Sequence, residues 1–307
     1  MKLPKQVRVW EVGPRDGLQN ESAILPTADK IAWIDSLTDA GLPFIEASSF
    51  VSPGWIPQLA DADEVFAGIR RRPETVYSAL APNARGLERA LAAGVNAVAV
   101  FMSASETHNR RNINKSIAQT HPVLREVTRG AKDQGVFVRG YVSTAFGCPY
   151  EGAVAVDQVL RVALRLLEDG VDEISLGDTI GVATPADTER VLQVLLKHIP
   201  TNRLALHMHD TRGTALANIL VGLTMGVTTF DSALGGLGGC PYAPGASGNV
   251  ATDDLVYMLE GLGILCGIRS QALERPLSVL RSAVGHSLRS HASAVLFAEG
   301  GMECGPV

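Results

Sequence analysis

The sequence alternates eight times between short apolar segments rich in β-branched residues and longer segments with a helical pattern. Each strand with the helix that follows it is one β/α unit, and eight units without a linker of altered composition favour one closed (β/α)₈ TIM barrel. The expected strands are 7–12, 43–47, 75–80, 96–102, 136–143, 172–176, 203–209 and 228–233. A doubly wound open sheet is the alternative, but no Gly-x-Gly-x-x-Gly motif follows the first strand.

The expected joints between helices and strands share one device, a glycine just before the next strand. Glycine adopts the left-handed conformation that ends many helices without a steric penalty. The positions are Gly41, Gly94, Gly135, Gly170 and Gly226. On this division residues 1–265 form the catalytic barrel. Residues 266–307 form a short C-terminal appendage, helical over 269–285 with an interruption at Pro276, and loose over 300–307.

Composition argues against several classes of function. The formal net charge of −5 gives no general attraction to nucleic acid or to an anionic membrane. No apolar run reaches the ~20 residues needed to span a bilayer, and the first residues show no secretory or transit leader. Four cysteines are too sparse for a disulfide scaffold. We therefore expect a cytoplasmic protein with reduced thiols and with neither a nucleic-acid nor a membrane partner.

The seventh expected strand ends in the pattern His-Met-His. Side chains on a strand alternate between its two faces, so His207 and His209 point the same way. Two neutral imidazoles side by side are suited to hold a metal ion, although two core histidines bonded to their neighbours are an equally ordinary interpretation. The choice depends on where further ligands fall.

Two more ligand candidates come from strand ends that would adjoin the seventh in a closed barrel. Asp16 follows the first strand and Asn249 follows the eighth. Each has an ordinary alternative, a turn residue for Asp16 and a helix N-cap for Asn249. Two imidazoles, a carboxylate and an amide oxygen, with no thiolate, favour Mg²⁺ or Mn²⁺ over structural zinc.

Arg15 stands beside Asp16 but is always cationic, so it cannot be a ligand. Its expected use is to stabilise an oxyanion formed next to the metal. Glu46, at the end of the second expected strand, would pair with Arg15 and fix its guanidinium. A structural salt bridge at the barrel mouth is an equally good interpretation of Glu46.

The segment 235–248 holds six glycines in fourteen residues. It lacks the lysine of a phosphate-binding P-loop, so a mobile lid over the barrel mouth explains it better. Its single thiol, Cys240, could act as an acid or proton relay, although an incidental thiol is the safer interpretation of Cys240 alone. Arg110, Arg111 and Lys115, after the fourth strand, are candidates for contact with phosphate groups, with a solvated basic face as the alternative.

The motifs together resemble the 3-hydroxy-3-methylglutaryl-CoA lyase family from about residue 7 to about residue 263. The segments that carry the resemblance are 12–21 (Val-Gly-Pro-Arg-Asp-Gly-Leu-Gln-Asn-Glu), 46–58, 147–152 (Gly-Cys-Pro-Tyr-Glu-Gly), 175–181 (Ser-Leu-Gly-Asp-Thr-Ile-Gly), 207–210 (His-Met-His-Asp) and 235–245. The lid segment with its cysteine is the most specific of them. The ending from His286 onward does not follow the family pattern.

The resemblance implies a divalent-metal-dependent carbon–carbon lyase acting on an acyl-CoA, and a homodimer. It implies as metal ligands Asp16, His207, His209 and Asn249, as catalytic residues Arg15, Cys240, Asp178 and Glu46, and as substrate-binding residues Gln19, Ser49, Tyr141 and Ser175. The implied reaction is retro-Claisen cleavage to acetyl-CoA and acetoacetate. Asp178, or a water that it positions, would accept the hydroxyl proton, and Arg15 would hold the enolate.

Three other activities are compatible with a barrel of this kind. One is a Claisen-condensing synthase on the same kind of barrel, which the cysteine-bearing lid and the lack of a second domain after the barrel disfavour. Another is a lyase for a longer-chain 3-hydroxyglutaryl-CoA, which pocket shape would decide. The third is a catalytically silent metal-binding protein, which the joint presence of Arg15, Cys240 and the four ligands disfavours.

Overall fold

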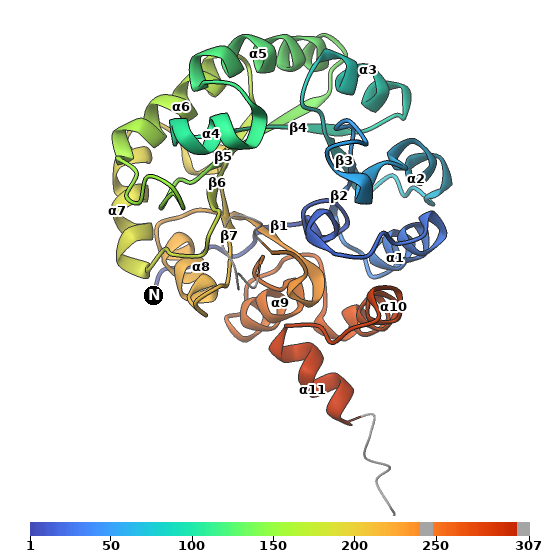
Figure 1. Cartoon of the computed structure of the whole chain (residues 1–307). Helices are drawn as coiled ribbons and strands as arrows, with labels where there is room; N and C mark the ends of the chain where they lie inside the picture. The colour runs from blue at the N-terminus through green and yellow to red at the C-terminus, as the bar shows by residue number, and fades with distance from the viewer. Residues whose placement is uncertain (240–247, 300–307) are drawn as a thin grey trace, which may run out of the picture.

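The computed structural model describes residues 1–239 and 248–299. Eight parallel strands pair in chain order, and β8 pairs with β1 to close the barrel (Figure 1). The strands are β1 (Arg8–Glu11), β2 (Phe44–Ser49), β3 (Val76–Leu80), β4 (Ala97–Ser103), β5 (Phe137–Ser143), β6 (Glu173–Asp178), β7 (Leu204–Met208) and β8 (Thr229–Ser232). Each falls within one residue or two of its expected range, so the predicted (β/α)₈ barrel is confirmed and the open-sheet alternative is wrong.

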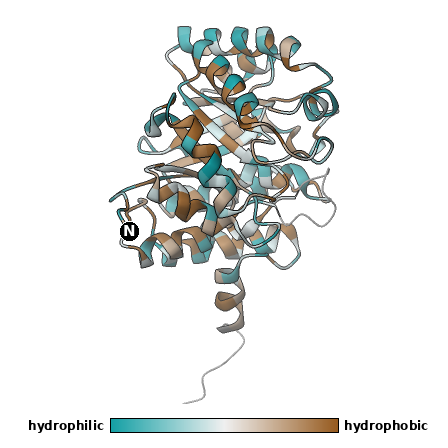
Figure 2. Cartoon of the chain, turned by 90° about the vertical axis from the view of Figure 1, so that its left-hand side faces the viewer, coloured by the Kyte–Doolittle hydropathy of each residue, from teal (hydrophilic) through white to brown (hydrophobic). Residues whose placement is uncertain are grey.

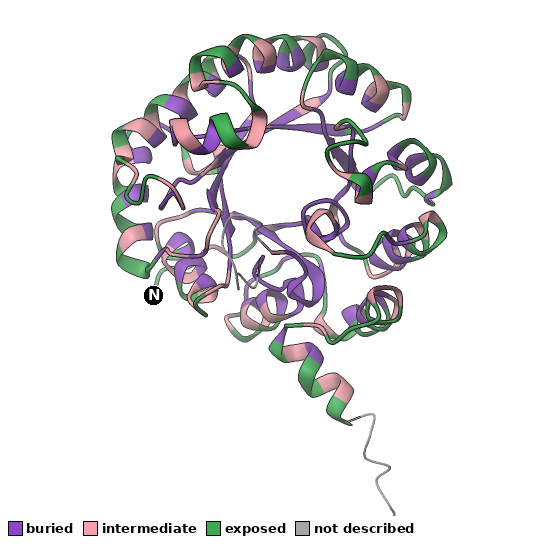
Figure 3. Ribbon diagram, in the orientation of Figure 1, coloured by how far each residue is buried: buried purple, intermediate pink, exposed green. Residues whose placement is uncertain are grey.

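A ring of helices surrounds the strands. Their bounds are α1 (Thr27–Asp39), α2 (Ala62–Gly68), α3 (Ala84–Ala92), α4 (Glu106–Ile113), α5 (Ile117–Asp133), α6 (Val156–Glu168), α7 (Pro185–Leu195), α8 (Ala215–Thr224) and α9 (Thr252–Gly261). Each helix buries the face toward the barrel and exposes the opposite one (Figure 3). Hydrophilic residues accordingly lie on the outward sides of these helices (Figure 2). Among the described residues no helix is both long and apolar enough to cross a membrane.

Local sequence explains several helix ends. The side chain of Ser116 accepts from the N–H of Gln119 at 3.1 Å and starts α5, and Thr184 caps α7 ahead of Pro185. The five joint glycines all have positive φ, between 68° and 105°, as predicted. Within the ring around the strands, the helix α4 was not predicted. Ser105 caps its start, accepting from the N–H of His108 at 3.1 Å.

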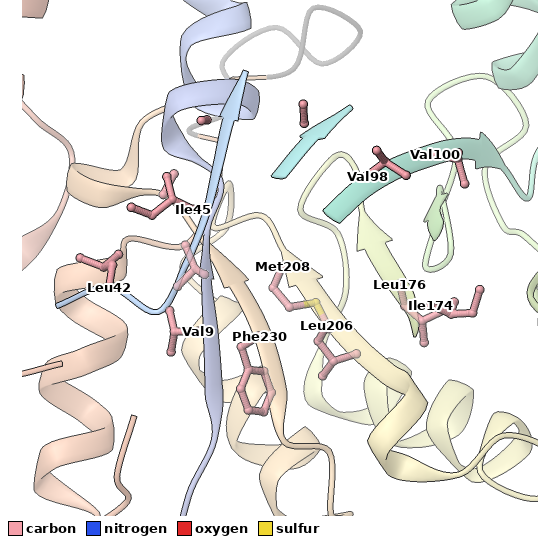
Figure 4. Packing of buried hydrophobic residues seen from close by; sticks show 14 of the residues in the cluster. Val9, Leu42, Ile45, Val98, Val100, Ile174, Leu176, Leu206, Met208 and Phe230 are labelled. Atoms are coloured by element: carbon pink, nitrogen blue, oxygen red, sulfur yellow. The ribbon is translucent and has the colours of Figure 1, made fainter. Parts of the chain in front are cut away.

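Two layers of side chains fill the molecule. Outward-facing strand residues pack against the helices as the main apolar core, and Figure 4 shows Val9, Ile45, Val98, Ile174, Leu176, Leu206, Met208 and Phe230 among them. The barrel interior, in contrast, holds Arg139. Its guanidinium lies 4.3 Å from the Trp10 ring centroid and pairs with Glu173 (2.8 Å) and Asp231 (2.8 Å). A buried charged cluster therefore occupies the middle of the barrel below the strand ends.

The C-terminal segment packs on the barrel before leaving it. The helix α10 (Glu274–Val284) runs unbroken through Pro276, so the predicted interruption is wrong. Pro276 is the third residue of α10, where a backbone N–H has no intrahelical partner to lose. Leu277 and Leu280 belong to the main core, and α10 contacts α1. The last described helix, α11 (His291–Glu299), projects away from the barrel (Figure 1). The segment 300–307, predicted to be loose, lies outside the described residues.

Candidate active site

A cavity of about 1140 Å³ opens at the C-terminal ends of the strands. This is the end of a (β/α)₈ barrel where loops and strand termini bring side chains from several units together. Of the predicted site residues, seven line the cavity: Arg15, Asp16, Gln19, Ser49, Tyr141, His207 and His209. The strand-end residues singled out from the sequence therefore meet at one place.

Three of these residues form a group that could hold a metal ion. One ligand atom each from Asp16, His207 and His209 lie within 4.8 Å of one another, and all three residues are buried. The Nε2 atoms of the two histidines are 3.3 Å apart, and the Oδ2 atom of Asp16 lies 3.7 Å from His207 Nε2 and 4.0 Å from His209 Nε2. Two nitrogens and a carboxylate oxygen thus face a common centre.

Asn249 is next to this group and completes a fitting donor set. It forms an isolated bridge with His209 in the backbone, and its Nδ2 donates to Asp16 Oδ2 at 2.8 Å. The buried Oδ1 of Asn249 has no hydrogen-bond partner among the described residues, which a ligand oxygen reserved for a cation would explain. The N-cap alternative is wrong, because α9 begins at Thr252 with Ala251 at its N-cap position. The residues present therefore fit a divalent cation with nitrogen and oxygen ligands.

Asp16 and Arg15 lie in one short π-helical turn, Gly13–Gly17, after β1. Arg15 donates from Nη1 to Asp16 Oδ1 at 2.5 Å and from Nε to Glu46, and it lies over the ring of Tyr141 at 5.1 Å. Burial alone would raise the pKa of Asp16, but the positive charge of Arg15, helped by the hydrogen bond from Asn249, holds it well below its usual range. Asp16 is therefore ionised and available as a ligand.

His209 is poised as a neutral ligand. Burial, and next the neighbouring His207, lower the pKa of His209 to about 4. On the other side of the pair, Nδ1 of His207 lies 3.3 Å from Asp231 Oδ2. Asp231, on β8, was not predicted from the sequence. The one charged residue of the eighth expected strand was the available signal.

Glu46 and Ser175 lie behind residues of the cavity lining. Glu46, fully buried, accepts from Arg15 Nε and from the hydroxyl of Tyr141. Ser175 donates to Asp231 Oδ2 at 2.6 Å. Both are thus placed to orient other side chains, and neither is brought to the surface of the cavity.

Asp178 is placed differently from its prediction. Glu173 and Ser175 on β6 face the barrel interior, so by strand alternation Asp178 faces outward. Its two carboxylate oxygens accept the backbone N–H groups of Val182 (3.0 Å) and Ala183 (2.9 Å). Its oxygens therefore serve the loop after β6, Asp178 is not among the residues that line the cavity, and its part in proton transfer stays a prediction.

Two glycines close the base of the lid segment. Gly238 and Gly248 both have positive φ, 131° and 92°, and a Cβ at Gly248 would lie only 2.5 Å from the carbonyl carbon of Gly238. Neither position therefore accepts a side chain. Cys240, the predicted lid thiol, lies outside the described residues.

The outer part of the cavity has a basic side. Arg111 and Lys115 line the cavity, and the guanidinium of Arg111 lies 4.3 Å from the ring centroid of Tyr150. Arg110 instead forms an ion pair with Glu106 on the same helix at 2.9 Å and is not part of the described lining. Of the three predicted basic residues, two are therefore available to a ligand.

An apolar cluster lies against the other side of the metal group. Leu80 and Tyr141 pack with the partly buried Val51 and Phe101 in a cluster separate from the main core. The ring of Tyr141 meets the ring of His207 edge-on, with centroids 5.8 Å apart. Leu80, Val51 and Phe101 all line the cavity, so it has an apolar wall next to its polar centre.

Comparison with known proteins agrees with this geometry. The HMGL-like family model matches residues 6–279. The chain is 53% identical over 290 residues to a hydroxymethylglutaryl-CoA lyase of Bacillus subtilis, covering 94% of this chain and 97% of the relative. It is 50% identical over 299 residues to a 3-hydroxy-3-isohexenylglutaryl-CoA/hydroxymethylglutaryl-CoA lyase of Pseudomonas aeruginosa, covering 97% and 100%. The crystal structure of the Bacillus subtilis HMG-CoA lyase superposes with a TM-score of 0.95 at 52% identity, covering 97% and 100%.

Proposed function

The chain belongs to the HMGL-like family and is a carbon–carbon lyase, and we propose that its barrel mouth cleaves 3-hydroxy-3-methylglutaryl-CoA into acetyl-CoA and acetoacetate. The observation that carries the proposal is the convergence of Asp16, His207 and His209 beside Arg15 in the large cavity. The substrate carries a hydroxyl, a carboxylate and a thioester. Its cleavage needs metal ligands and a fixed cation at one place, and the cavity provides both kinds of group.

The four proposed ligands are Asp16, His207, His209 and Asn249. When bound, a divalent cation would lower the pKa of the substrate's C3 hydroxyl and orient it together with a neighbouring oxygen. The absence of thiolate from this set supports Mg²⁺ or Mn²⁺. The ionised carboxylate of Asp16 and the neutral imidazole of His209 are in the protonation states that such a cation requires.

Arg15 is the residue proposed to act on the developing charge. Cleavage of the C2–C3 bond leaves an enolate on the thioester, and a fixed cation stabilises it as it forms. Two of the five guanidinium N–H groups serve Glu46 and Asp16, so others remain for a ligand in the cavity that Arg15 lines. Glu46 and Tyr141 hold the guanidinium in place and are positioning residues.

Proton transfer is assigned to two further residues. Cys240 on the lid is proposed to protonate the enolate, as a thiol carried over the cavity can. The proposed part of Asp178 is limited to a water held at the loop after β6, since its own oxygens accept backbone N–H groups. Gln19 and Ser49 are proposed to contact the substrate because they line the cavity.

The coenzyme A portion of the substrate would lie toward the basic side of the cavity. Arg111 and Lys115 provide positive charge there, and phosphate oxygens are the groups such side chains bind. Tyr150 fixes the plane of the Arg111 guanidinium.

One experiment tests the central proposal. Purified protein is treated with EDTA, passed through a desalting column, and assayed for acetoacetate release from the CoA ester with no metal, with Mg²⁺ and with Mn²⁺. We expect no release without metal and restored release with either ion. Full activity of the metal-free protein would refute the metal-dependent mechanism, and absence of acetoacetate under all conditions would refute the lyase assignment.

The apolar wall favours a second candidate substrate, a 3-hydroxyglutaryl-CoA with a longer 3-substituent. Leu80, Val51 and Phe101 would bury an alkyl chain that extends from C3, and the Pseudomonas aeruginosa relative is named for such a substrate. The test compares kcat/KM for the methyl and the isohexenyl esters. A ratio within about tenfold supports use of both, whereas release from the methyl ester alone excludes the second.

We further propose a homodimer in the cytoplasm. The described cysteines, Cys148 and Cys266, are free and buried, which suits a reducing compartment. Sedimentation velocity checks the first proposal and fractionation of the producing cells the second.

A further inference from the structure

We propose that Asp231 is the positioning residue that fixes the tautomer and ring orientation of His207, and thereby keeps its Nε2 free for the metal. The inference rests on the proposed metal site. It goes beyond that site because Asp231 does not contact the cavity centre itself and acts only through His207.

Strand pairing places the two residues together. His207 on β7 and Asp231 on β8 are Cα partners in the register of the parallel pair, so their side chains leave the sheet side by side. Asp231 Oδ2 lies 3.3 Å from His207 Nδ1, while the other ring nitrogen, Nε2, lies 3.3 Å from His209 Nε2 and 3.7 Å from Asp16 Oδ2. The imidazole thus spans the distance between the carboxylate of Asp231 and the proposed ligand group.

The charge of Asp231 decides which nitrogen carries the proton. Its Oδ1 pairs with the buried guanidinium of Arg139 at 2.8 Å, the geometry of a carboxylate held by a fixed cation. An ionised carboxylate can only accept. A proton on Nδ1 of His207 would be donated to it, whereas a bare Nδ1 lone pair would face negative charge. The Nδ1–H tautomer is therefore favoured, and Nε2 is left with the lone pair that a metal needs.

Hydrogen bonds and burial hold the carboxylate of Asp231 in this orientation. Its Oδ1 accepts from Arg139 Nη2 at 2.8 Å, its Oδ2 accepts from Ser175 at 2.6 Å, and the residue is 1% exposed. Arg139 is in turn fixed by Glu173 at 2.8 Å. The charged cluster in the middle of the barrel therefore serves as a rigid support for one metal ligand.

The same barrel supplies a matched control. Glu173→Gln removes a carboxylate from the same arginine as Asp231→Asn does, but Glu173 is hydrogen-bonded to Arg139, Arg8 and Thr229 rather than to His207. Both variants leave Arg139 short of one counter-charge. They differ in whether His207 loses its acceptor.

Two measurements on these proteins test the inference without relying on turnover. The first is ¹⁵N NMR of the histidine rings in metal-free protein, with His207 identified by its loss in His207→Gln. The second is Mn²⁺ affinity from the free-ion EPR signal at fixed pH. We expect Nδ1–H on His207 in the wild type, loss of that preference in Asp231→Asn, and Mn²⁺ binding about 10- to 100-fold weaker. Glu173→Gln should keep the tautomer and bind Mn²⁺ within about threefold of the wild type.

Three outcomes would overturn the inference: Nε2–H on His207 in the wild type, unchanged Mn²⁺ affinity in Asp231→Asn, or an equal loss in Glu173→Gln. If Asp231→Asn does not fold, the double variant Asp231→Asn, Arg139→Gln replaces it. This variant removes the buried carboxylate together with the guanidinium that pairs with it. The same readouts then apply, and the wild-type tautomer decides independently. Failure of the wild type to bind Mn²⁺ at all would instead refute the proposed metal site.

Discussion

Replacing Glu11 by glutamine should stabilise this protein at neutral and alkaline pH. Glu11 ends β1 on the outer side of the barrel and is fully buried. Its Oε1 accepts the backbone N–H groups of Gly13 (2.8 Å) and Leu234 (3.0 Å), and its Oε2 accepts from the hydroxyl of Thr252 at 2.5 Å. Glutamine has the same shape. Its oxygen can accept the same two N–H groups and its amide can donate to the Thr252 hydroxyl, as a protonated Glu11 would.

The magnitude follows from the pKa of Glu11. Burial is the main cause that raises the pKa of Glu11 from 4.5 to about 7, and the nearby charge of Asp253 raises it further. Three hydrogen bonds to the carboxylate lower the pKa but do not offset the burial. The folded state then holds a proton that the unfolded state has released between pH 4.5 and 7, so this group's contribution to stability falls as pH rises. The accumulated loss is on the order of 3 kcal/mol above pH 7. Glutamine has no proton to lose and avoids this cost.

Urea unfolding followed by circular dichroism, at pH 5 and at pH 8, measures the effect. The variant should be more stable than wild type by less than about 1 kcal/mol at pH 5 and by about 3 kcal/mol at pH 8. Glu88→Gln removes an exposed carboxylate on α3 and should stay within about 0.5 kcal/mol at both values. A Glu11→Gln variant no more stable than wild type at pH 8 would show that the buried carboxylate ionises without cost.

Three further outcomes concern the cavity. Arg15→Gln should lower kcat by about 10²-fold or more with KM little changed, because it removes an oxyanion donor. Steady-state kinetics with saturating Mg²⁺ measure both constants. A large rise in KM at near-normal kcat would make Arg15 a substrate-binding residue. Cys240→Ser should fold and bind metal normally but lose most turnover, and a substrate analogue should protect the wild type from a thiol reagent; a fully active variant would make the thiol incidental. Arg111→Ala should raise KM for the CoA ester about tenfold, on the scale of one lost charge-assisted hydrogen bond. Arg110→Ala, whose guanidinium pairs with Glu106, should leave KM unchanged, and the same KM in both variants would contradict the proposed basic side.

The barrel and the metal group could be predicted because both depend on local periodicity. Strand alternation aims His207 and His209 the same way, and the joint glycines mark where helices end. The same rule of alternation shows which way Asp178 faces. Counting from Ser175 puts Asp178 on the outer face, whereas the prediction took its role from the family resemblance, which says nothing of the face on which the side chain lies.

What could not be predicted depends on the register between strands far apart in the chain. Asp231 meets His207 only because β7 and β8 pair in one particular register, and no pattern within either strand specifies it. The helix α4 was missed for another reason. Its sequence, Glu-Thr-His-Asn-Arg-Arg-Asn-Ile, is short and strongly polar, without the apolar stripe from which helices are inferred, and it depends on the cap at Ser105.

The close approach of Gly238 and Gly248 has a consequence for how such barrels diversify. Because the backbone closes at these two positions, the segment between them is a cassette whose ends are fixed by the barrel. Doubling the length of a flexible loop costs only about 0.6 kcal/mol in closure entropy. The segment 240–247 could therefore be replaced by a longer or shorter segment from a relative without a change in the positions of the metal ligands. The two glycines must stay, since a graft that brought a Cβ to Gly248 would push Asn249 out of register.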